Sequence, residues 1–166
     1  MTGLVTTHAD FAGASWHDNY IYGVSIGVGD IAAGDWRAEL VLDIDHIIEW
    51  VRGEAGGVQF RVAPATLAYH HATDLKLDVD WGDSGHQTAV NEASIHQITR
   101  TQIADQKICL DRPYYRWRIE LNWPAGGDIS FGASGYTQTL RSEPILQDAQ
   151  KLVGPKRAPL KLPLGP

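Results

Sequence analysis

The sequence predicts a mainly β fold of the strand-rich α+β kind: an antiparallel bent sheet, a sandwich or an open barrel that carries one short helix. Three observations predict it. Apolar and polar residues alternate with a period of two in about seven segments. Turns of hairpin length rich in glycine and proline separate these segments, and one segment alone has a helical period. With 166 residues, 43% of them hydrophobic, the chain is long enough for one domain with a sizeable core.

The first predicted strand covers residues 20–28. Its apolar side chains alternate and share one face, and Gly29 and Asp30 end it. The alternating set is Tyr20, Tyr22, Val24, Ile26 and Val28. The preceding residues 1–14 are small and polar without a period, which predicts a flexible N-terminal arm that Phe11 pins to the body.

Residues 36–51 contain a strand that runs into the predicted helix. Leu40, Leu42 and Ile44 alternate with other residues and predict the strand. From Ile44 the apolar positions fall at i, i+3, i+4 and i+7, which predicts a helix over residues 44–51 that Asp45 caps and Gly53 ends.

The later strands follow the same alternation. They are expected at residues 58–62, 66–70, 73–81, 91–100, 115–123 and 129–133. Pro64 predicts a sheet edge or a bend between the first two. Residues 91–100 also fit a short helix, although we favour a strand. The turn PAGG joins the last two strands as a hairpin.

The chain is predicted to divide into residues 1–14, a single β-rich domain over 15–150, and a proline-rich basic tail over 151–166. The net charge is −6, but four of the 14 lysines and arginines lie in the tail, which has no acid. Residues 1–150 therefore carry ten basic against 20 acidic side chains. Such a body repels phosphate backbones, so we expect no nucleic-acid partner, whereas a basic protein partner is favoured.

Localisation is predicted from what the sequence lacks. It has no signal-peptide pattern at its start and no apolar run of the roughly 20 residues that cross a bilayer. We therefore expect a cytoplasmic protein with no membrane partner. The single cysteine, Cys109, is expected to be a small core residue. We expect no cofactor, and the oligomeric state, including a homo-oligomer, stays open.

The densest group of ionisable residues lies where the predicted strand meets the predicted helix. Asp43, Asp45 and His46, joined by His17, could supply oxygen and nitrogen ligands to a divalent cation. The structural interpretation is that Asp45 caps the helix and Asp43 is solvated. We favour it because the spacing matches no metal motif. The sequence also lacks the signatures of known catalytic and nucleotide-binding loops.

Two other sets of residues have a structural and a functional interpretation. Asp78 and Asp80 share one strand face, and we expect them to form cross-strand ion pairs with Arg116 and Arg118. Three of the six tryptophans lie on predicted apolar faces as core residues: Trp81, Trp117 and Trp123. The other three lie at element ends, where an exposed set would form a binding surface: Trp16, Trp36 and Trp50.

The segment WHDNYIYGVSI, followed by LDID and by PATLAYHHATDLKLDVDW, resembles a loose group of bacterial β-rich domains of unassigned activity. These domains open with an aromatic-His-Asp triplet before a strand, and some are similar to immunity proteins that neutralise a toxin. The resemblance covers about residues 15–81. It identifies Trp16, His17 and Asp18 as a shared feature and implies no catalytic role for them.

The function favoured by the sequence is binding of a protein partner by a non-enzymatic, immunity-type domain with an acidic surface. The binding residues expected are Trp16, Trp36, Trp50, Asp43 and Asp45. The alternative is a metal-dependent hydrolase whose ligands would be His17, Asp43, Asp45 and His46. A third interpretation is a small-ligand pocket lined by tryptophans.

Overall fold

The computed structural model describes residues 5–53, 56–82, 91–104 and 111–157. Within these ranges, strands form one antiparallel 10-stranded sheet. The strands are β1 (Val5–Thr7), β2 (Tyr20–Val28), β3 (Ala38–Arg52), β4 (Val58–His70), β5 (Thr73–Asp78), β6 (Ala93–Gln102), β7 (Tyr115–Trp123), β8 (Asp128–Ala133), β9 (Gly135–Leu140) and β10 (Ile145–Gln147). The predicted mainly β, antiparallel fold class is confirmed.

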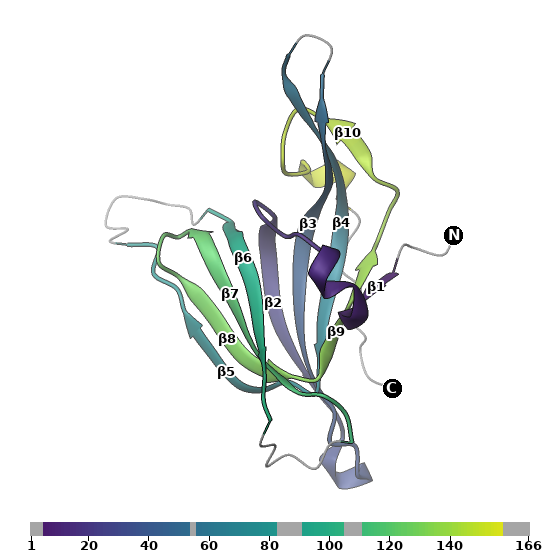
Figure 1. The fold of residues 1–166 in the computed structure, drawn as a ribbon, viewed down its shortest axis with the longest axis vertical. Helices are drawn as coiled ribbons and strands as arrows, with labels where there is room; N and C mark the ends of the chain where they lie inside the picture. The colour runs from purple at the N-terminus through teal and green to yellow at the C-terminus, as the bar shows by residue number, and fades with distance from the viewer. Residues whose placement is uncertain (1–4, 54–55, 83–90, 105–110, 158–166) are drawn as a thin grey trace.

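The strand order is β1-β9-β4-β3-β2-β6-β7-β8-β5, and β10 pairs with β4. The sheet bends between β2 and β6, whose only pairing joins Tyr20 and Ile21 to Ser94 and Ala93. The bend places a second layer, β6 to β5, over a first layer, β1 to β2 (Figure 1). We call the facing sides of the two layers the inner faces and their other sides the outer faces. Only Ser134 separates β8 from β9, so the chain changes layer at this residue.

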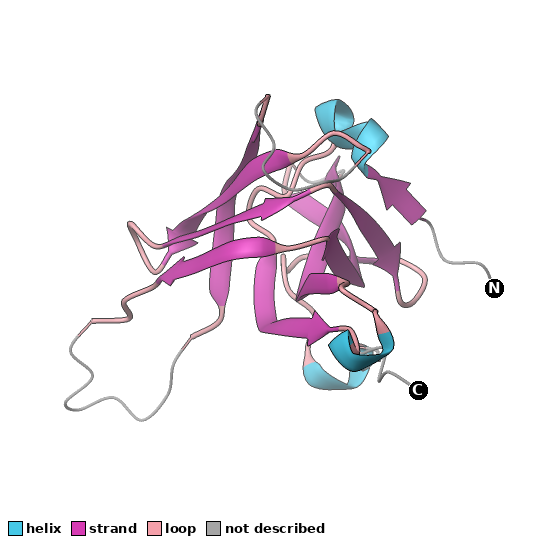
Figure 2. Ribbon diagram, turned by 90° about the horizontal axis from the view of Figure 1, so that it is seen from below, coloured by secondary structure: helices cyan, strands magenta, loops and turns pink. Residues whose placement is uncertain are grey.

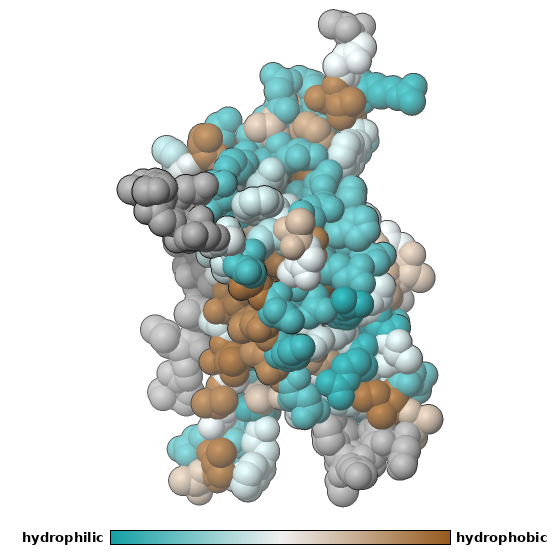
Figure 3. Space-filling model, turned by 90° about the vertical axis from the view of Figure 1, so that its left-hand side faces the viewer, coloured by the Kyte–Doolittle hydropathy of each residue, from teal (hydrophilic) through white to brown (hydrophobic). Residues whose placement is uncertain are grey.

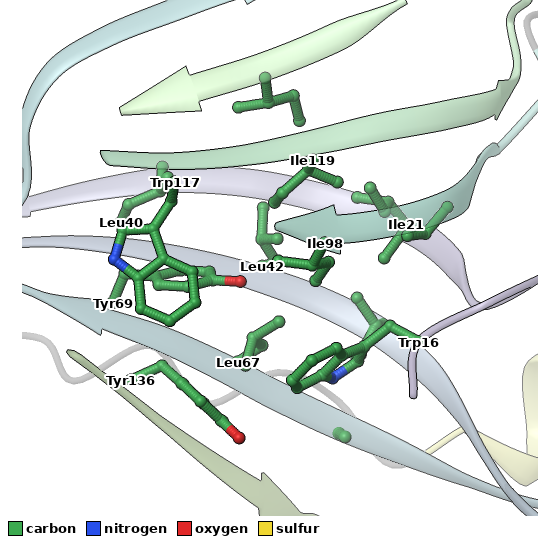
Figure 4. Close-up of a cluster of buried hydrophobic side chains, with 14 of the residues drawn as sticks. Trp16, Ile21, Leu40, Leu42, Leu67, Tyr69, Ile98, Trp117, Ile119 and Tyr136 are labelled. Atoms are coloured by element: carbon green, nitrogen blue, oxygen red, sulfur yellow. The ribbon is translucent and has the colours of Figure 1, made fainter. Parts of the chain in front are cut away.

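Large apolar side chains fill the space between the inner faces (Figure 4). Trp117 of β7 is fully buried at their centre. Its ring centroid lies 5.0 Å from that of Tyr69 on β4 and 6.5 Å from the parallel ring of Phe131 on β8. Aromatic pairs of this kind add to the free energy gained by burying their area. One core shared by both layers therefore holds the fold together.

The helix predicted over residues 44–51 is wrong, because these residues belong to β3. This 15-residue strand is paired with β2 along one edge and with β4 along the other. It is covered on both faces, with Ile44 in the main core and Ile47 in a second cluster on the outer face. A bulge at Ile48 then shifts the alternation. Apolar residues on both faces of a bulged strand therefore produce the i, i+3, i+4, i+7 spacing of a helix. Asp45 lies within the strand and is not a helix cap.

β3 and β4 continue past the neighbouring strands as a projecting hairpin (Figure 1). The predicted interruption at Pro64 is a change of neighbour, because β4 itself is continuous. Residues 65–70 of β4 pair with β9, and residues 60–62 pair with β10. A proline lacks the N–H that a ladder needs, and Pro64 lies between these two ladders.

The predicted bounds of β2, Tyr20–Val28, are confirmed, but its side chains do not share one face. A bulge at Tyr22 shifts the register against β3. Tyr20 and Tyr22 therefore lie on the outer face, whereas Val24, Ile26 and Val28 lie on the inner face. The sequence alternates without interruption, so it does not show that the extra residue of the bulge moves the later side chains to the other face.

The other predicted strands are confirmed, although the strand expected at residues 73–81 ends at Asp78 as β5, and those expected at 58–62 and 66–70 are parts of the single strand β4. The 115–123 and 129–133 segments form the β7–β8 hairpin, and residues 91–100 supply most of β6. Among the described residues, the ion pairs expected of Asp78 and Asp80 with Arg116 and Arg118 are not formed. Asp78 lies 3.7 Å from Nζ of Lys76 on its own strand, and Arg116 reaches across β8 to Asp74 of β5, at 3.9 Å. Arg118 instead pairs with Asp128 of β8, with Nε 2.8 Å from the carboxylate.

Both ends of the described chain are bound to the sheet. Residues 5–13, expected to be a loose arm, form β1 and the 3-10 helix η1 (His8–Gly13), and Phe11 packs edge-on at 5.3 Å from Trp117. Two further 3-10 helices are η2 (Ile31–Ala33) and η3 (Gly154–Lys156). All three lie at the periphery of the strands (Figure 2). The rest of the predicted tail, residues 158–166, and Cys109 lie outside the described residues.

Candidate functional site

Asp43 and Asp45 lie side by side on the outer face of β3. They are two residues apart on a strand, so their side chains point the same way. Asp45 is fully buried and Asp43 is 9% exposed. Sequence analysis expects Asp43 in water, so its burial corrects that interpretation. Buried carboxylates need charged or hydrogen-bonding partners.

Two arginines provide those partners. Nη2 of Arg141, which follows β9, lies 2.6 Å from Asp43 Oδ1, and Arg141 Nη1 also donates to the carbonyl of Ala65 at 2.7 Å. Arg157 donates from Nε to Asp45 at 2.8 Å and from Nη2 to Asp43 at 2.7 Å. Each carboxylate is therefore paired with a guanidinium in low-dielectric surroundings.

The Arg157 side chain is also held by an aromatic ring. Its guanidinium carbon lies 3.6 Å from the centroid of Tyr22, the bulged residue of β2. The Tyr22 hydroxyl donates to Asp45 at 3.0 Å, and the Leu152 amide donates to the same carboxylate at 2.7 Å. Burial, and then the neighbouring Asp45 carboxylate, raise the pKa of Tyr22 far above its usual range. This arrangement fastens the C-terminal segment to the sheet and leaves Asp45 saturated with donors.

The expected metal ligands are not brought together. Asp43 and Asp45 lie on the outer face, whereas His46, the next residue, points to the inner side of β3. His17 donates from Nδ1 to the carbonyl oxygen of His96 at 2.8 Å. Among the described residues, no group of three or more His, Cys, Asp or Glu side chains could hold a metal ion.

His46 is held as a neutral imidazole. Burial lowers its pKa from 6.5 to about 4. Its Nδ1 lies 2.8 Å from Nδ2 of the fully buried Asn19, an amide nitrogen that can only donate. The Asn19 oxygen accepts from the Ile47 amide at 3.1 Å, which fixes the orientation of the amide group.

This burial predicts a pH dependence of stability that a His46→Gln variant should lack. The unfolded chain protonates this histidine near pH 6.5, whereas the folded chain does so near pH 4. The contribution of His46 is therefore complete above pH 6.5 and is lost as the pH falls towards 4. Between pH 7 and 4.5, urea unfolding should show a decrease in unfolding free energy about 2 kcal/mol larger in the wild type than in His46→Gln. An equal decrease in unfolding free energy in the wild type and in His46→Gln would contradict this prediction.

The tryptophans do not form the expected exposed set. Trp16 is 4% exposed and donates from its ring nitrogen to Gln138 at 2.6 Å, so it belongs to the core. Trp36 and Trp50 are 75% and 51% exposed. They lie at opposite ends of β3, on the order of 45 Å apart along the strand. Of the tryptophans expected in the core, Trp117 is buried, whereas Trp81 and Trp123 are 41% and 44% exposed.

The surface of the described residues has an apolar groove, which we call the open mouth. It lies between β2 of the first layer and β5 of the second, where the inner faces are open to solvent, and has a volume of about 570 Å³. Its apolar lining includes Val24, Leu77, Val79, Trp81, Leu121 and Ile129. Figure 3 faces this side of the molecule and shows a continuous apolar strip there.

The inner face of β2 extends the open mouth along the strand. Val24, Ile26 and Val28 lie opposite Leu42, Leu40 and Ala38 of β3, and are 39%, 58% and 76% exposed. The second layer covers Leu40 and Leu42 but not these three residues. Exposed apolar groups gathered in one strip are typical of binding surfaces.

One acidic residue, Glu92, lines the open mouth, and three exposed acidic residues lie on or next to the strands that border it: Asp78 and Asp80 at the end of β5, and Asp30 after β2. A backbone hydrogen bond and Lys151, 3.2 Å away, keep the pKa of Glu92 below its usual value, so this carboxylate stays ionised. Sequence analysis missed this site because it assigned the apolar residues of β2 and β5 to the core.

Comparisons of the chain with protein-family models, curated proteins and solved structures find no match. No helix in the described part of the chain has the length and hydrophobicity needed to span a lipid bilayer.

Proposed function

We propose that this protein is a non-enzymatic binding domain that holds a basic segment of a partner protein in the open mouth. The observation that carries the proposal is the strip of exposed apolar side chains on the inner face of β2, next to a groove of about 570 Å³. Burying such side chains contributes roughly 25 cal/mol per Å² of apolar area. A neutralising protein of the immunity type, which the resemblance implies, belongs to this class.

Charge supports a basic partner. The net charge of −6, together with the exposed Asp30, Asp78 and Asp80, attracts lysines and arginines and speeds encounter with them. The same net charge opposes a second copy of this chain, because two copies repel each other. The Asp43 and Asp45 carboxylates do not take part, since Arg141 and Arg157 already pair with them.

A peptide titration tests the proposal. The probe is a fluorescein-labelled, end-capped heptapeptide of alternating lysine and valine, and anisotropy reports its binding to the full chain. We expect Ile26→Asp to weaken binding at least about tenfold, because the new carboxylate would be buried against valine. The matched control is Val58→Asp, which changes a residue 46% exposed on the projecting β3–β4 hairpin, away from the mouth.

The control variant should bind the peptide as the wild type does, and a peptide of alternating glutamate and valine should not bind. Equal affinity for wild type and Ile26→Asp, or no binding of the basic peptide to the wild type, would contradict the proposal. A dimer in light scattering that Ile26→Asp dissociates would replace the partner by a second copy.

A further inference from the structure

β2 has one open edge. It pairs with β3 from Tyr20 to Val28, but with β6 only at Tyr20 and Ile21. From Gly23 to Val28, no described strand pairs with its other edge. Backbone N–H and C=O groups on such an edge can pair with an incoming strand.

The register identifies which backbone groups face that edge. The Gly29 amide donates to the carbonyl of Arg37 at 2.7 Å, and the register with β3 is unbroken from Gly23 to Val28. Hydrogen-bonded pairs alternate along an antiparallel ladder, so Gly23, Ser25 and Gly27 bond to β3. The amides and carbonyls of the residues between and beyond them therefore point to the open edge.

Those residues are Val24, Ile26 and Val28, whose side chains form the exposed strip on the inner face. The same three residues thus offer both backbone partners and apolar surface to one ligand. An extended segment that lies beside β2 would use both at once, since residues directly opposite in an antiparallel pair share a face.

We propose that the partner segment binds as an additional antiparallel strand along β2. This inference rests on the proposed function and names its mode of recognition. The segment alternates apolar and basic residues over about six positions. Its apolar side chains cover the inner face, and its basic side chains point the other way into water, where the negative charge of the domain attracts them. We infer the antiparallel direction because both described neighbours of β2 are antiparallel to it.

The direction of the strand determines which peptide amides matter. In an antiparallel pair, the residues opposite Val24, Ile26 and Val28 exchange hydrogen bonds with them and share their face. The valine amides of the lysine–valine heptapeptide would therefore bond to β2, and its lysine amides would face solvent. In a parallel pair the lysine amides would bond instead.

Two N-methylated peptides test this. One carries methyl groups on its three valine amides, and the other on three lysine amides, so that side chains, charge and number of methyl groups match. Against the full chain, we expect methylation at valine to weaken binding at least about tenfold, and methylation at lysine to change it less than about threefold.

The outcomes separate this inference from the proposed function. If Ile26→Asp weakens binding of the unmethylated peptide while both methylated peptides bind as tightly as it does, the mouth binds side chains alone and strand addition is wrong. Loss of binding on methylation at lysine alone would overturn the antiparallel direction. If Ile26→Asp has no effect, the proposed function itself fails.

Discussion

Replacing Arg157 with alanine is expected to lower the free energy of unfolding by about 3 to 5 kcal/mol, as measured by urea denaturation. The variant leaves the fully buried Asp45 without its charged partner and removes one of two guanidinium groups from Asp43. It also removes the cation that lies over Tyr22. An uncompensated buried carboxylate is the main cost, because its partner is lost while its desolvation remains.

The matched control is Arg37→Ala. Arg37 makes an equally short pair, with Nη2 2.6 Å from Asp35, but its side chain is 76% exposed. Water solvates both groups when this pair is broken, so the variant should unfold like the wild type. If both variants lost a similar amount of unfolding free energy, burial of Asp43 and Asp45 would not be the reason that Arg157 stabilises the fold.

The second large effect is expected for Trp117→Ala, at about 3 to 5 kcal/mol of unfolding free energy. The side chain is fully buried between the layers and contacts rings from both of them, including Tyr69 and Phe131. Its ring nitrogen also donates to the carbonyl of Ala133 at 3.1 Å. Removing it leaves a cavity that strands on two sides cannot close.

Trp36→Ala provides the comparison for this variant. Trp36 has the same side chain but is 75% exposed, so its removal opens no cavity. Thermal unfolding should give a clearly lower Tm for Trp117→Ala than for Trp36→Ala. Equal Tm values would mean that the rings between the layers add little to the stability.

Period-two alternation predicts most of this fold because it reports the two faces of a strand. It located β2 and the β7–β8 hairpin correctly. It failed at residues 44–51, where both faces of β3 are covered and Ile48 is bulged. A bulge of a single residue does not change the amino-acid pattern of a strand. The sequence therefore could not show that residues 44–51 are a strand, or that the side chains of β2 lie on two faces.

The site was harder to predict than the fold. Sequence proximity suggested that Asp43, Asp45 and His46 act together, but neighbours on a strand point to opposite faces. The partners of Asp43 are Arg141 and Arg157, about 100 residues away in sequence, which local spacing cannot reveal. The open mouth depends on which apolar residues the second layer leaves uncovered, and that is a property of the bend between β2 and β6.

The passage of the chain from β8 to β9 through Ser134 has a consequence for how the molecule unfolds. Residues 128–140 form β8, an interior strand of the second layer, and β9, an interior strand of the first. Neither layer can therefore unfold without removing an interior strand from the other. Loss of order should be all-or-none, with circular dichroism and tryptophan emission following a single transition.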